Sequence, residues 1–453
     1  MRDVYIIFDI GKTNKKCLVF NEQYNIEYIS QCQFTTINDD DGDESEDLES
    51  VVAWINQNIT DLTNNENFNV QGINVSAYGA TIVYLDANGP LDFPVESYTK
   101  TYPKAILEQF ITAHSSNVDI QTSSPFSGML NTGLQLYKLK YSQPSRFKKV
   151  SWVLHLAQFL SYTLTGQKVS EICNLGCHTL LWDFNKNRYH DWVTQEKFDL
   201  LMPPLMSNRE TFPLAKTSNI IKVGIGIHDS SAALIPFQLI DEGPFLLIST
   251  GTWCVILNPF NYTPISRELL DMDCLQYMSY EGKPVLATKV FLGHEHQCHE
   301  KLLLTYYGLK NAEENCIFDS RIYDHIALFS GRYFNFESVD GGNISQNLEA
   351  FPNFITAYHR LIFEITSILV TRILLVKGDL EIKNLYLDGG FAKNTVFIQT
   401  LQRQIPQQRI IIPDCNVGSA LGAMLLIVPN ISKSDLTNAL NLQTVECLYP
   451  NET

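Results

Sequence analysis

The opening of the chain constrains its fold most, because it places a polar loop between two apolar runs. VYIIFDIGKTNKKCLVFN, residues 4–21, has the pattern of a strand, a loop and a returning strand. A hairpin turn needs a glycine, but it does not need Asp9 at the end of a buried strand. The acid therefore indicates that the loop has a function beyond turning the chain.

The same pattern returns about 240 residues later, in GPFLLISTGTWCVILNP, residues 243–259. An apolar run again ends in a short polar loop, and a second apolar run follows. A repeat at this distance predicts two related domains, each beginning with a hairpin. Ser249 and Thr250 stand in the stretch that holds the acid in the first copy, so the second hairpin has no acid.

Three further segments combine glycine or other small residues with a helix. Residues 383–404 predict a strand, the loop DGGFAKN and an amphipathic helix. Residues 222–237 predict a glycine-rich connection, then His228 and Asp229, then a short apolar helix. Residues 416–426 predict a helix with small residues on one face, which lets another backbone or a flat ligand approach closely.

Strands alternate with helices along the rest of the chain, which predicts an α/β protein. Helical periodicity marks three other segments, residues 47–59, 151–166 and 354–376. We expect two α/β domains facing each other across a cleft. The polar stretch 214–222 suggests a boundary that divides the chain into domains of residues 1–218 and 219–453.

The net charge of −16 disfavours binding to nucleic acid or to an anionic membrane. No stretch reaches the roughly 18 apolar residues of a membrane span; residues 361–376 come nearest, and Glu364 and Arg372 interrupt them. The first residues do not have the pattern of a secretory signal. We therefore expect a cytoplasmic protein with reduced cysteines, and the sequence leaves a homodimer open.

Glycine-rich turns after strands expose backbone N–H groups that bind phosphate oxygens. The two hairpins and the DGGFAKN loop make three such turns, with four short side-chain donors, Thr13, Asn14, Thr252 and Asn394. Lys12 and Lys16 add positive charge. Neither the dinucleotide-binding nor the P-loop pattern occurs, so we expect a nucleotide held between the hairpins.

Two acids fit phosphate chemistry. A carboxylate at Asp9 would repel a triphosphate unless a divalent cation stands between them, and Mg²⁺ takes one or two carboxylates with water and phosphate oxygens. Asp229 has two equal interpretations. It is a base for an attacking hydroxyl, or it is the N-cap of the helix that follows.

Two polar segments have simpler interpretations. The acidic run 39–49 is expected to be a solvated loop that leads into a helix N-terminus. His294, His296 and His299 are compatible with a metal site or with a loop that touches substrate, but a solvated helix start is the favoured reading.

Four segments resemble the FGGY carbohydrate kinases in order and spacing: D-I-G-K-T-N-K-K, G-I-H-D-S-S-A-A, S-T-G-T-W and D-G-G-F-A-K-N. These kinases phosphorylate sugars with ATP. The resemblance implies an α/β fold of two actin-like ATPase (RNase H-like) domains flanking a central cleft. It also implies a Mg²⁺ ion at Asp9 and Asp229, and Asp229 as the catalytic base that takes a proton from the sugar hydroxyl.

The remaining site residues are implied by the same motifs. Those expected near the nucleotide are Gly11, Thr13, Asn14, Lys16, Gly251, Thr252, Gly389, Gly390, Asn394 and Gly418. Those expected near the sugar are Tyr78, Gly79, Ala80, Tyr98, His228 and Asp229. The first loop departs from the family pattern at Lys12, Asn14 and Lys15.

His228 before Asp229, and Trp253 after the second loop, are similar to the rhamnulose and fuculose kinases within the family. This similarity favours a ketose such as L-rhamnulose or L-fuculose as the small-molecule substrate. The alternative is an actin-like sensor or chaperone-type ATPase without sugar kinase activity, in which Asp229 is only a cap.

Overall fold

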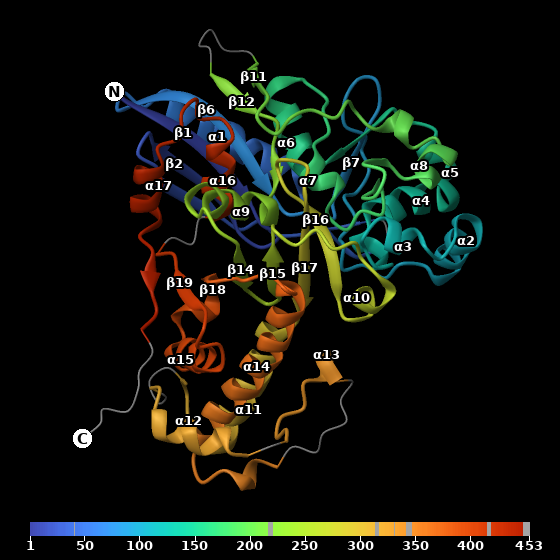
Figure 1. Ribbon diagram of the computed structural model, residues 1–453. Helices are drawn as coiled ribbons and strands as arrows, with labels where there is room; N and C mark the ends of the chain where they lie inside the picture. Colours follow the sequence, from blue (N-terminus) through green and yellow to red (C-terminus); the bar gives the residue numbers. More distant parts are fainter. Residues whose placement is uncertain are drawn as a thin grey trace.

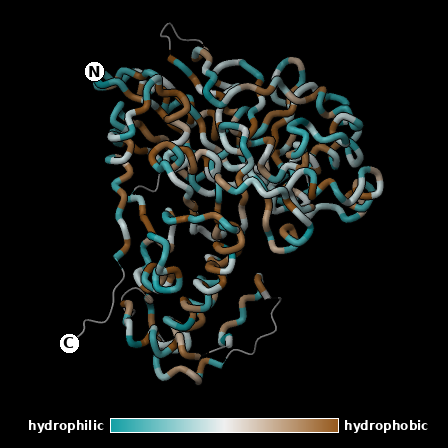
Figure 2. Tube along the Cα trace, viewed as in Figure 1, coloured by the Kyte–Doolittle hydropathy of each residue, from teal (hydrophilic) through white to brown (hydrophobic). Residues whose placement is uncertain are grey.

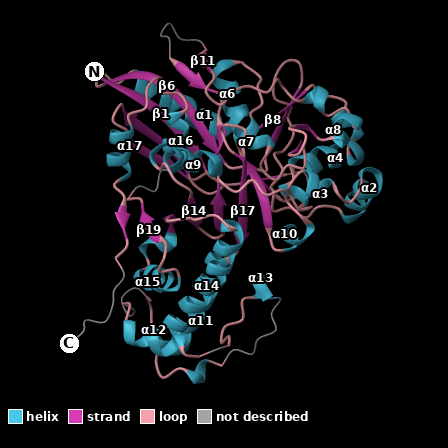
Figure 3. Ribbon diagram, in the orientation of Figure 1, coloured by secondary structure: helices cyan, strands magenta, loops and turns pink. Residues whose placement is uncertain are grey.

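The computed structural model describes residues 1–39, 41–215, 221–312, 317–329, 331–340, 347–414 and 418–446. Within these residues, two seven-stranded sheets form the centres of an α/β fold, and helices pack around them (Figures 1 and 3). The first sheet contains β1 (Arg2–Ile10), β2 (Lys15–Asn21), β3 (Ile26–Cys32), β6 (Phe68–Ala77), β11 (Thr211–Pro213), β12 (Lys222–Gly224) and β13 (Ile227–His228). The second contains β14 (Phe245–Thr250), β15 (Cys254–Asn258), β16 (Cys274–Met278), β17 (Pro284–Val290), β18 (Asn384–Gly389), β19 (Arg409–Ile412) and β20 (Gln443–Thr444).

The two sheets share one topology. The path β3-β2-β1-β6-β12-β11 in the first matches β17-β15-β14-β18-β19-β20 in the second. The hairpin is antiparallel in each, its first strand runs parallel to the next strand inward, and the last strand is antiparallel again. The repeated hairpin predicted from the sequence is confirmed, and so is the fold of two actin-like domains.

Strand β1 is buried on both faces, and its side chains alternate between two cores. Val4, Ile6 and Phe8 pack with α1 (Leu48–Thr63) and α6 (Leu156–Thr165). Tyr5 and Ile7 point to the other face, where the core includes residues of α9 (Asp229–Ile240), α16 (Gly418–Leu425) and α17 (Lys433–Leu440). Helices from the second half of the chain thus cover the first sheet, and Figure 2 shows hydrophobic segments among these strands.

Helix α14 (Phe354–Lys377) is the longest helix of the second domain and lies beside α11 (Leu292–Tyr307) in Figure 1. It is buried on most sides, and its interrupting Glu364 is paired with Arg360 at 2.7 Å. No helix among the described residues is long and apolar enough to cross a membrane.

The remaining elements include two mostly buried helices, α4 (Thr132–Ser142) and α15 (Thr395–Gln404). The other helices are α2 (Lys104–His114), α3 (Val118–Gln121), α5 (Pro144–Phe147), α7 (Ile172–Leu175), α8 (Asp191–Gln195), α10 (Arg267–Asp271), α12 (Ser320–Ala327) and α13 (Glu337–Asp340). The other strands are β4 (Ile37–Asn38), β5 (Glu44–Ser45), β7 (Ile82–Leu85), β8 (Trp152–His155), β9 (Trp182–Asp183) and β10 (Arg188–Tyr189).

Two sequence-based expectations need comment. Residues 151–166 are not one helix: Trp152–His155 form strand β8, which pairs with β7, and α6 begins only at Leu156. The β-branched and aromatic start of that segment pairs with a neighbouring strand, which overrides its helical periodicity. The boundary expected between residues 218 and 219 falls in 216–220, outside the described residues, and stays a prediction.

Candidate active site

Asp9 lies at the end of β1, just before the first loop. The loop is closed by the Gly11 N–H, which donates to the Asn14 carbonyl at 3.0 Å. Thr13 and Asn14 are exposed at its tip, and Lys16 stands opposite Asp9 in the strand register. The predicted phosphate loop is therefore present as a tight, partly exposed turn with an acid and a lysine at its base.

The carboxylate of Asp9 is in an unfavourable environment for a negative charge. Burial, followed by the nearby charge of Asp229, raises its pKa to about 6 against the opposing effects of Ser419 and Lys16. The Ser419 hydroxyl of α16 donates to Oδ1 of Asp9 at 2.9 Å. The first and last parts of the chain thus meet at this acid, and a cation between the two carboxylates would relieve their repulsion.

Asp229 is the first residue of α9, and it does not cap the helix. The N-cap position belongs to His228, which makes no side-chain capping bond. The Asp229 carboxylate instead accepts from the N–H of the adjacent Ser230 at 2.6 Å. Its side chain is 33% exposed, and burial of the remainder raises its pKa to about 6. The capping alternative is wrong, and a poised carboxylate remains.

His228 lies behind Asp229. Its side chain is 4% exposed, its Nε2 lies 3.3 Å from Oδ1 of Asp229 and 3.3 Å from Sγ of Cys177, and its Nδ1 lies 3.4 Å from the Ser231 hydroxyl. Gly79 lies against the imidazole. Burial lowers the pKa of His228 to about 4, so the ring is neutral near pH 7. These contacts position Asp229, while contact of His228 with a sugar stays a prediction.

The residues expected near the sugar form an aromatic corner. The rings of Tyr78 and Tyr98 meet edge to face with their centroids 6.1 Å apart. The Tyr78 hydroxyl donates to Oε2 of Glu46 at 2.8 Å, and Ala80, which is buried with φ 58°, follows in the strand-end turn. Asp229 lies close enough to Tyr98 for its charge to raise the pKa of the phenol further, after burial. The corner and the poised carboxylate are therefore neighbours.

Glu46 belongs to the acidic run that the sequence presents as a solvated loop. That expectation is wrong for Glu46 and Asp39, whose side chains are buried, although Asp47 does cap α1 as expected. Lys15 reaches Glu46 with its Nζ 2.6 Å from Oε1, and Lys100 pairs with Asp39 at 2.6 Å. Buried lysine partners, which lie far away in sequence, pair with both acids in the interior.

The loops of the second domain line one cavity of about 360 Å³. Four predicted nucleotide residues are among those lining it, namely Gly251, Thr252, Gly390 and Asn394. Gly389, directly before Gly390, has a φ of 97°. A Cβ at this position would lie 2.4 Å from the Thr250 carbonyl, so only glycine allows β18 to approach the second hairpin this closely. The structure thus brings together loops that are about 140 residues apart in sequence.

His296 and Tyr358 also line this cavity, and sequence reasoning did not assign them to it. The Tyr358 hydroxyl lies 3.1 Å from Nε2 of His296 and accepts from Nδ2 of Asn394 at 2.8 Å. The expected helix start is present, because α11 begins at Leu292, but it is only partly solvated: His294 is exposed, whereas Glu295 and His299 are buried. Their register on a helix that packs against α14 was the signal available in the sequence.

Asp388 is a second residue that sequence reasoning left out. It precedes Gly389, accepts from the Gly389 N–H at 2.7 Å, and has its pKa raised by burial while the charge of Lys16 lowers it. Lys16 therefore lies near both Asp9 of the first domain and Asp388 of the second. A role of Lys16 toward a phosphate stays a prediction.

Gly418 does not line the second-domain cavity. It is buried near Ala233 of α9, and further along α16 Gly422 lies against the Ala232 backbone. Of the two uses offered for the small residues of this helix, close approach of another backbone is the one that the structure displays. A role of Gly418 toward a nucleotide stays a prediction.

The carboxylates near Asp9 suit an ion that takes most of its other ligands from water and phosphate oxygens. Among the described residues, the only three His, Cys, Asp or Glu side chains close enough to share an ion are Asp39, Asp41 and Asp43, and Lys100 is already paired with all three. Asp9 and Asp229 form no closed cage. One or two carboxylates with open positions fit Mg²⁺, which retains water and binds phosphate oxygens.

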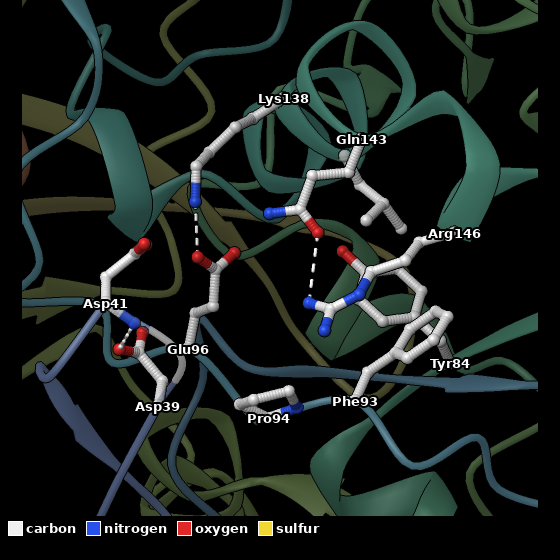
Figure 4. A pocket seen from close by; sticks show the side chains of 10 residues that line it. Asp39, Asp41, Tyr84, Phe93, Pro94, Glu96, Lys138, Gln143 and Arg146 are labelled. Atoms are coloured by element: carbon white, nitrogen blue, oxygen red, sulfur yellow. Dashed lines mark hydrogen bonds and ion pairs between the residues drawn. The ribbon is translucent and has the colours of Figure 1, made fainter.

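A hollow beside Asp39 and Asp41 is too small for a sugar or a nucleotide (Figure 4). Its volume is about 30 Å³, which is room for about one water molecule. Lys138 is paired with Glu96 across it, and Nη1 of Arg146 donates to Gln143 at 3.1 Å. This region is a structural polar cluster, so the candidate site stays with Asp9, Asp229 and the second-domain cavity.

Known proteins are similar to this chain in sequence and in fold. A rhamnulokinase of Yersinia pestis (strain Pestoides F) is 23% identical over 266 residues, 55% of this chain and 53% of that protein. The chain thus spans about half the length of the curated relatives it matches. A carbohydrate kinase from Novosphingobium aromaticivorans superposes with a TM-score of 0.77 at 20% identity, covering 98% of this chain and 96% of that one.

A glycerol kinase of Plasmodium falciparum, solved with ADP, superposes with a TM-score of 0.74 at 17% identity, covering 97% of this chain and 92% of the other. The profile of the FGGY family of carbohydrate kinases, N-terminal domain, matches residues 4–234, which is half of the chain. From the repeated hairpins, the two matching sheets and this profile, we conclude that the chain belongs to the FGGY family of carbohydrate kinases.

Proposed function

We propose that this protein is an ATP-dependent sugar kinase in which Asp229 is the general base. One observation carries the proposal: a partly exposed carboxylate with a pKa raised to about 6 stands at a helix start, within electrostatic reach of the acid of a phosphate-type loop. A general base works best when its pKa lies near the working pH. A sensor or chaperone needs no such base.

The two domains supply different groups to the transfer. The second-domain cavity takes the nucleotide, with the Gly251 and Gly390 loops at its phosphates. Lys16 offsets negative charge between the domains. The aromatic corner of Tyr78 and Tyr98 borders the sugar, and Asp229 accepts the proton of the attacking hydroxyl while His228 holds the carboxylate in place.

Asp9, together with Asp229, is the proposed protein contribution to a Mg²⁺ site. Burial and the neighbouring acid raise the pKa of Asp9, and a cation bound here would stabilise its ionised form. When bound, the ion would supply charge neutralisation at the phosphate oxygens. The residues of this chain orient the two substrates and exclude water as the domains close.

For the acceptor we propose a ketose, with L-rhamnulose or L-fuculose first. The rhamnulokinases among the sequence relatives support this choice, as does the His228–Asp229 pair. A cytoplasmic location fits the proposed activity. Whether the protein forms a homodimer is decided by size-exclusion chromatography with light scattering.

The test is a coupled assay of ADP release with purified protein, across ketoses, aldoses and polyols. We expect release that depends on one acceptor class, with ketoses fastest. Asp229→Asn should lower kcat roughly 1000-fold while ADP binding stays within threefold. Slow ADP release that no acceptor stimulates would instead support a nucleotide-dependent sensor. Full turnover by Asp229→Asn would show that Asp229 is not the general base.

A further inference from the structure

Two lysines of the first loop have different surroundings. Lys15 is 2% exposed; its Nζ lies 2.6 Å from Oε1 of Glu46 and donates to the Lys12 carbonyl at 2.9 Å. The Tyr78 hydroxyl donates to the other oxygen of Glu46 at 2.8 Å. The charge of Glu46 is thus matched by Lys15, and both its oxygens already have close partners.

Lys12 is left with a weak pairing. Its Nζ lies 3.9 Å from Oε2 of Glu46, beyond hydrogen-bond distance, and its side chain is 22% exposed. Two lysines against one glutamate leave one positive charge in this cluster. At this distance the ammonium has no hydrogen bond to Glu46 to lose when it turns to a stronger anion.

Lys12 belongs to the first loop by its backbone and to the aromatic corner by its side chain. Lys12 follows Gly11, so its backbone belongs to the phosphate-type loop that Asp9 precedes. Its Nζ lies 6.0 Å from the ring centroid of Tyr78 and 5.9 Å from that of Tyr98. The charge of Asp229 acts on the same Tyr98 ring. The ammonium of this loop residue and the carboxylate of Asp229 therefore both lie near Tyr98.

We infer that Lys12 is a further catalytic residue, whose ammonium binds the phosphoryl group while it passes from the nucleotide to the acceptor. The inference rests on the proposed kinase function. In that step the acceptor oxygen bonds to the γ-phosphorus as the bond from phosphorus to the bridging oxygen of ADP breaks. The bond's electrons remain on ADP, and the acceptor proton goes to Asp229. Lys12 donates hydrogen bonds to the non-bridging oxygens and transfers no proton.

A charge at this point has a second conceivable partner, which is a carboxylate carried by the acceptor. The two are distinguishable, because a phosphoryl contact acts on every acceptor and on water alike. A carboxylate contact acts on acidic acceptors alone and appears mainly in KM. The placement of Lys12 on the phosphate-type loop itself favours the phosphoryl group.

The test compares Lys12→Met, which keeps length and loses charge, with Lys12→Arg, which keeps charge. Lys168→Met is the matched control, because Lys168 lies 5.0 Å from the Tyr162 ring centroid, after the end of α6. We measure kcat and KM for neutral and acidic acceptors, the rate of ATP hydrolysis without acceptor, and calorimetric binding of ADP with and without aluminium fluoride, which mimics the transferred group.

We expect Lys12→Met to lower kcat roughly 100-fold for every acceptor and to lower acceptor-free hydrolysis by a similar factor. KM and ADP binding should stay within threefold, and the tightening of ADP binding by aluminium fluoride should disappear. Lys12→Arg should recover at least a tenth of the wild-type kcat. Lys168→Met should match the wild type.

Three results would overturn the inference: an unchanged kcat in Lys12→Met, a loss confined to the KM of acidic acceptors, or a loss in Lys12→Met that Lys12→Arg shares in full alongside a lowered Tm. A wild-type protein that phosphorylates no acceptor tests the kinase function itself. In that case the aluminium fluoride comparison still reports on Lys12, so the two failures are separable.

Discussion

The two domains hold an aspartate and a serine at the same place in their sheets, but on exchanged strands. In the first sheet Asp9 of β1 stands beside Ser76 of β6. In the second, Ser249 of β14 stands beside Asp388 of β18. Asp9 and Ser249 each come two residues before the glycine of their hairpin loop, and Asp388 comes directly before Gly389.

The exchange changes what each hairpin does. The first hairpin carries the acid itself, and α16 covers it with Ser419. The second hairpin carries no charged residue from Ser249 to Trp253, and Gly251, Thr252 and Trp253 are exposed. The same topology thus gives a first hairpin with an acid, which we propose for a metal and a reacting phosphate. The second hairpin offers only backbone and hydroxyl groups.

Removal of the first acid should have the largest effect on this comparison. Asp9→Asn should lower kcat roughly 100- to 1000-fold and weaken the dependence of the rate on Mg²⁺ concentration, since the metal loses a charged ligand. Ser249→Ala, at the equivalent point of the other hairpin, should stay within threefold. Steady-state kinetics across a Mg²⁺ series measures both variants. Equal losses of kcat would mean that the two hairpins do not differ in their contribution to the reaction.

The pH profile should have a moderate effect of known sign. Burial raises the pKa of Asp9 and of Asp229 to about 6, and both must be ionised to act. Below that pH they take up protons, so kcat/KM should fall at least tenfold per pH unit, whereas above about 7 it should be flat. The control is recovery of activity after return to pH 7.5. A flat profile from pH 5 to 8 would contradict the assignment of either acid.

The smallest expected effect concerns the second-domain cavity, which His296 of α11 lines. His296→Ala removes the contact with the Tyr358 hydroxyl and the edge contact with Phe391, whose ring centroid is 5.1 Å away. The KM for ATP should rise about fivefold with kcat unchanged, as for the loss of one hydrogen bond. His294→Ala, an exposed residue two positions earlier, is the control. A changed KM for the acceptor instead would place His296 elsewhere in the reaction.

Much of the fold could be predicted from the sequence, because period and punctuation are local signals. The two hairpins, the DGGFAKN turn and the helix after Asp229 all appear where their patterns indicate. Asp9 stood out because an acid at the end of a buried run has no local explanation, whereas Asp229 could equally have been a helix cap. Their roles remain predictions, but their neighbourhood could be anticipated.

Contacts between residues that are far apart in the chain could not be predicted from the sequence. Glu46 looked like part of a solvated acidic run, because nothing local indicates that Lys15 will pair with it or that Tyr78 will donate a hydrogen bond to it. The strand at Trp152–His155 depends on pairing with β7. The sequence does not indicate that Asp388 pairs with Ser249 across two neighbouring strands. Each of these depends on tertiary neighbours rather than on propensity.

The contact between Ser419 and Asp9 has a consequence for synthesis. A ribosome releases β1 long before α16, so the nascent first domain lacks the hydroxyl that holds its acid, and it also lacks the helices that cover Tyr5 and Ile7. Helix α9 can cover part of this apolar face once about 220 further residues have been added, but α16 and α17 follow only after more than 400. The nascent chain therefore depends on the last part of translation both for burial of that face and for the geometry of its first acid.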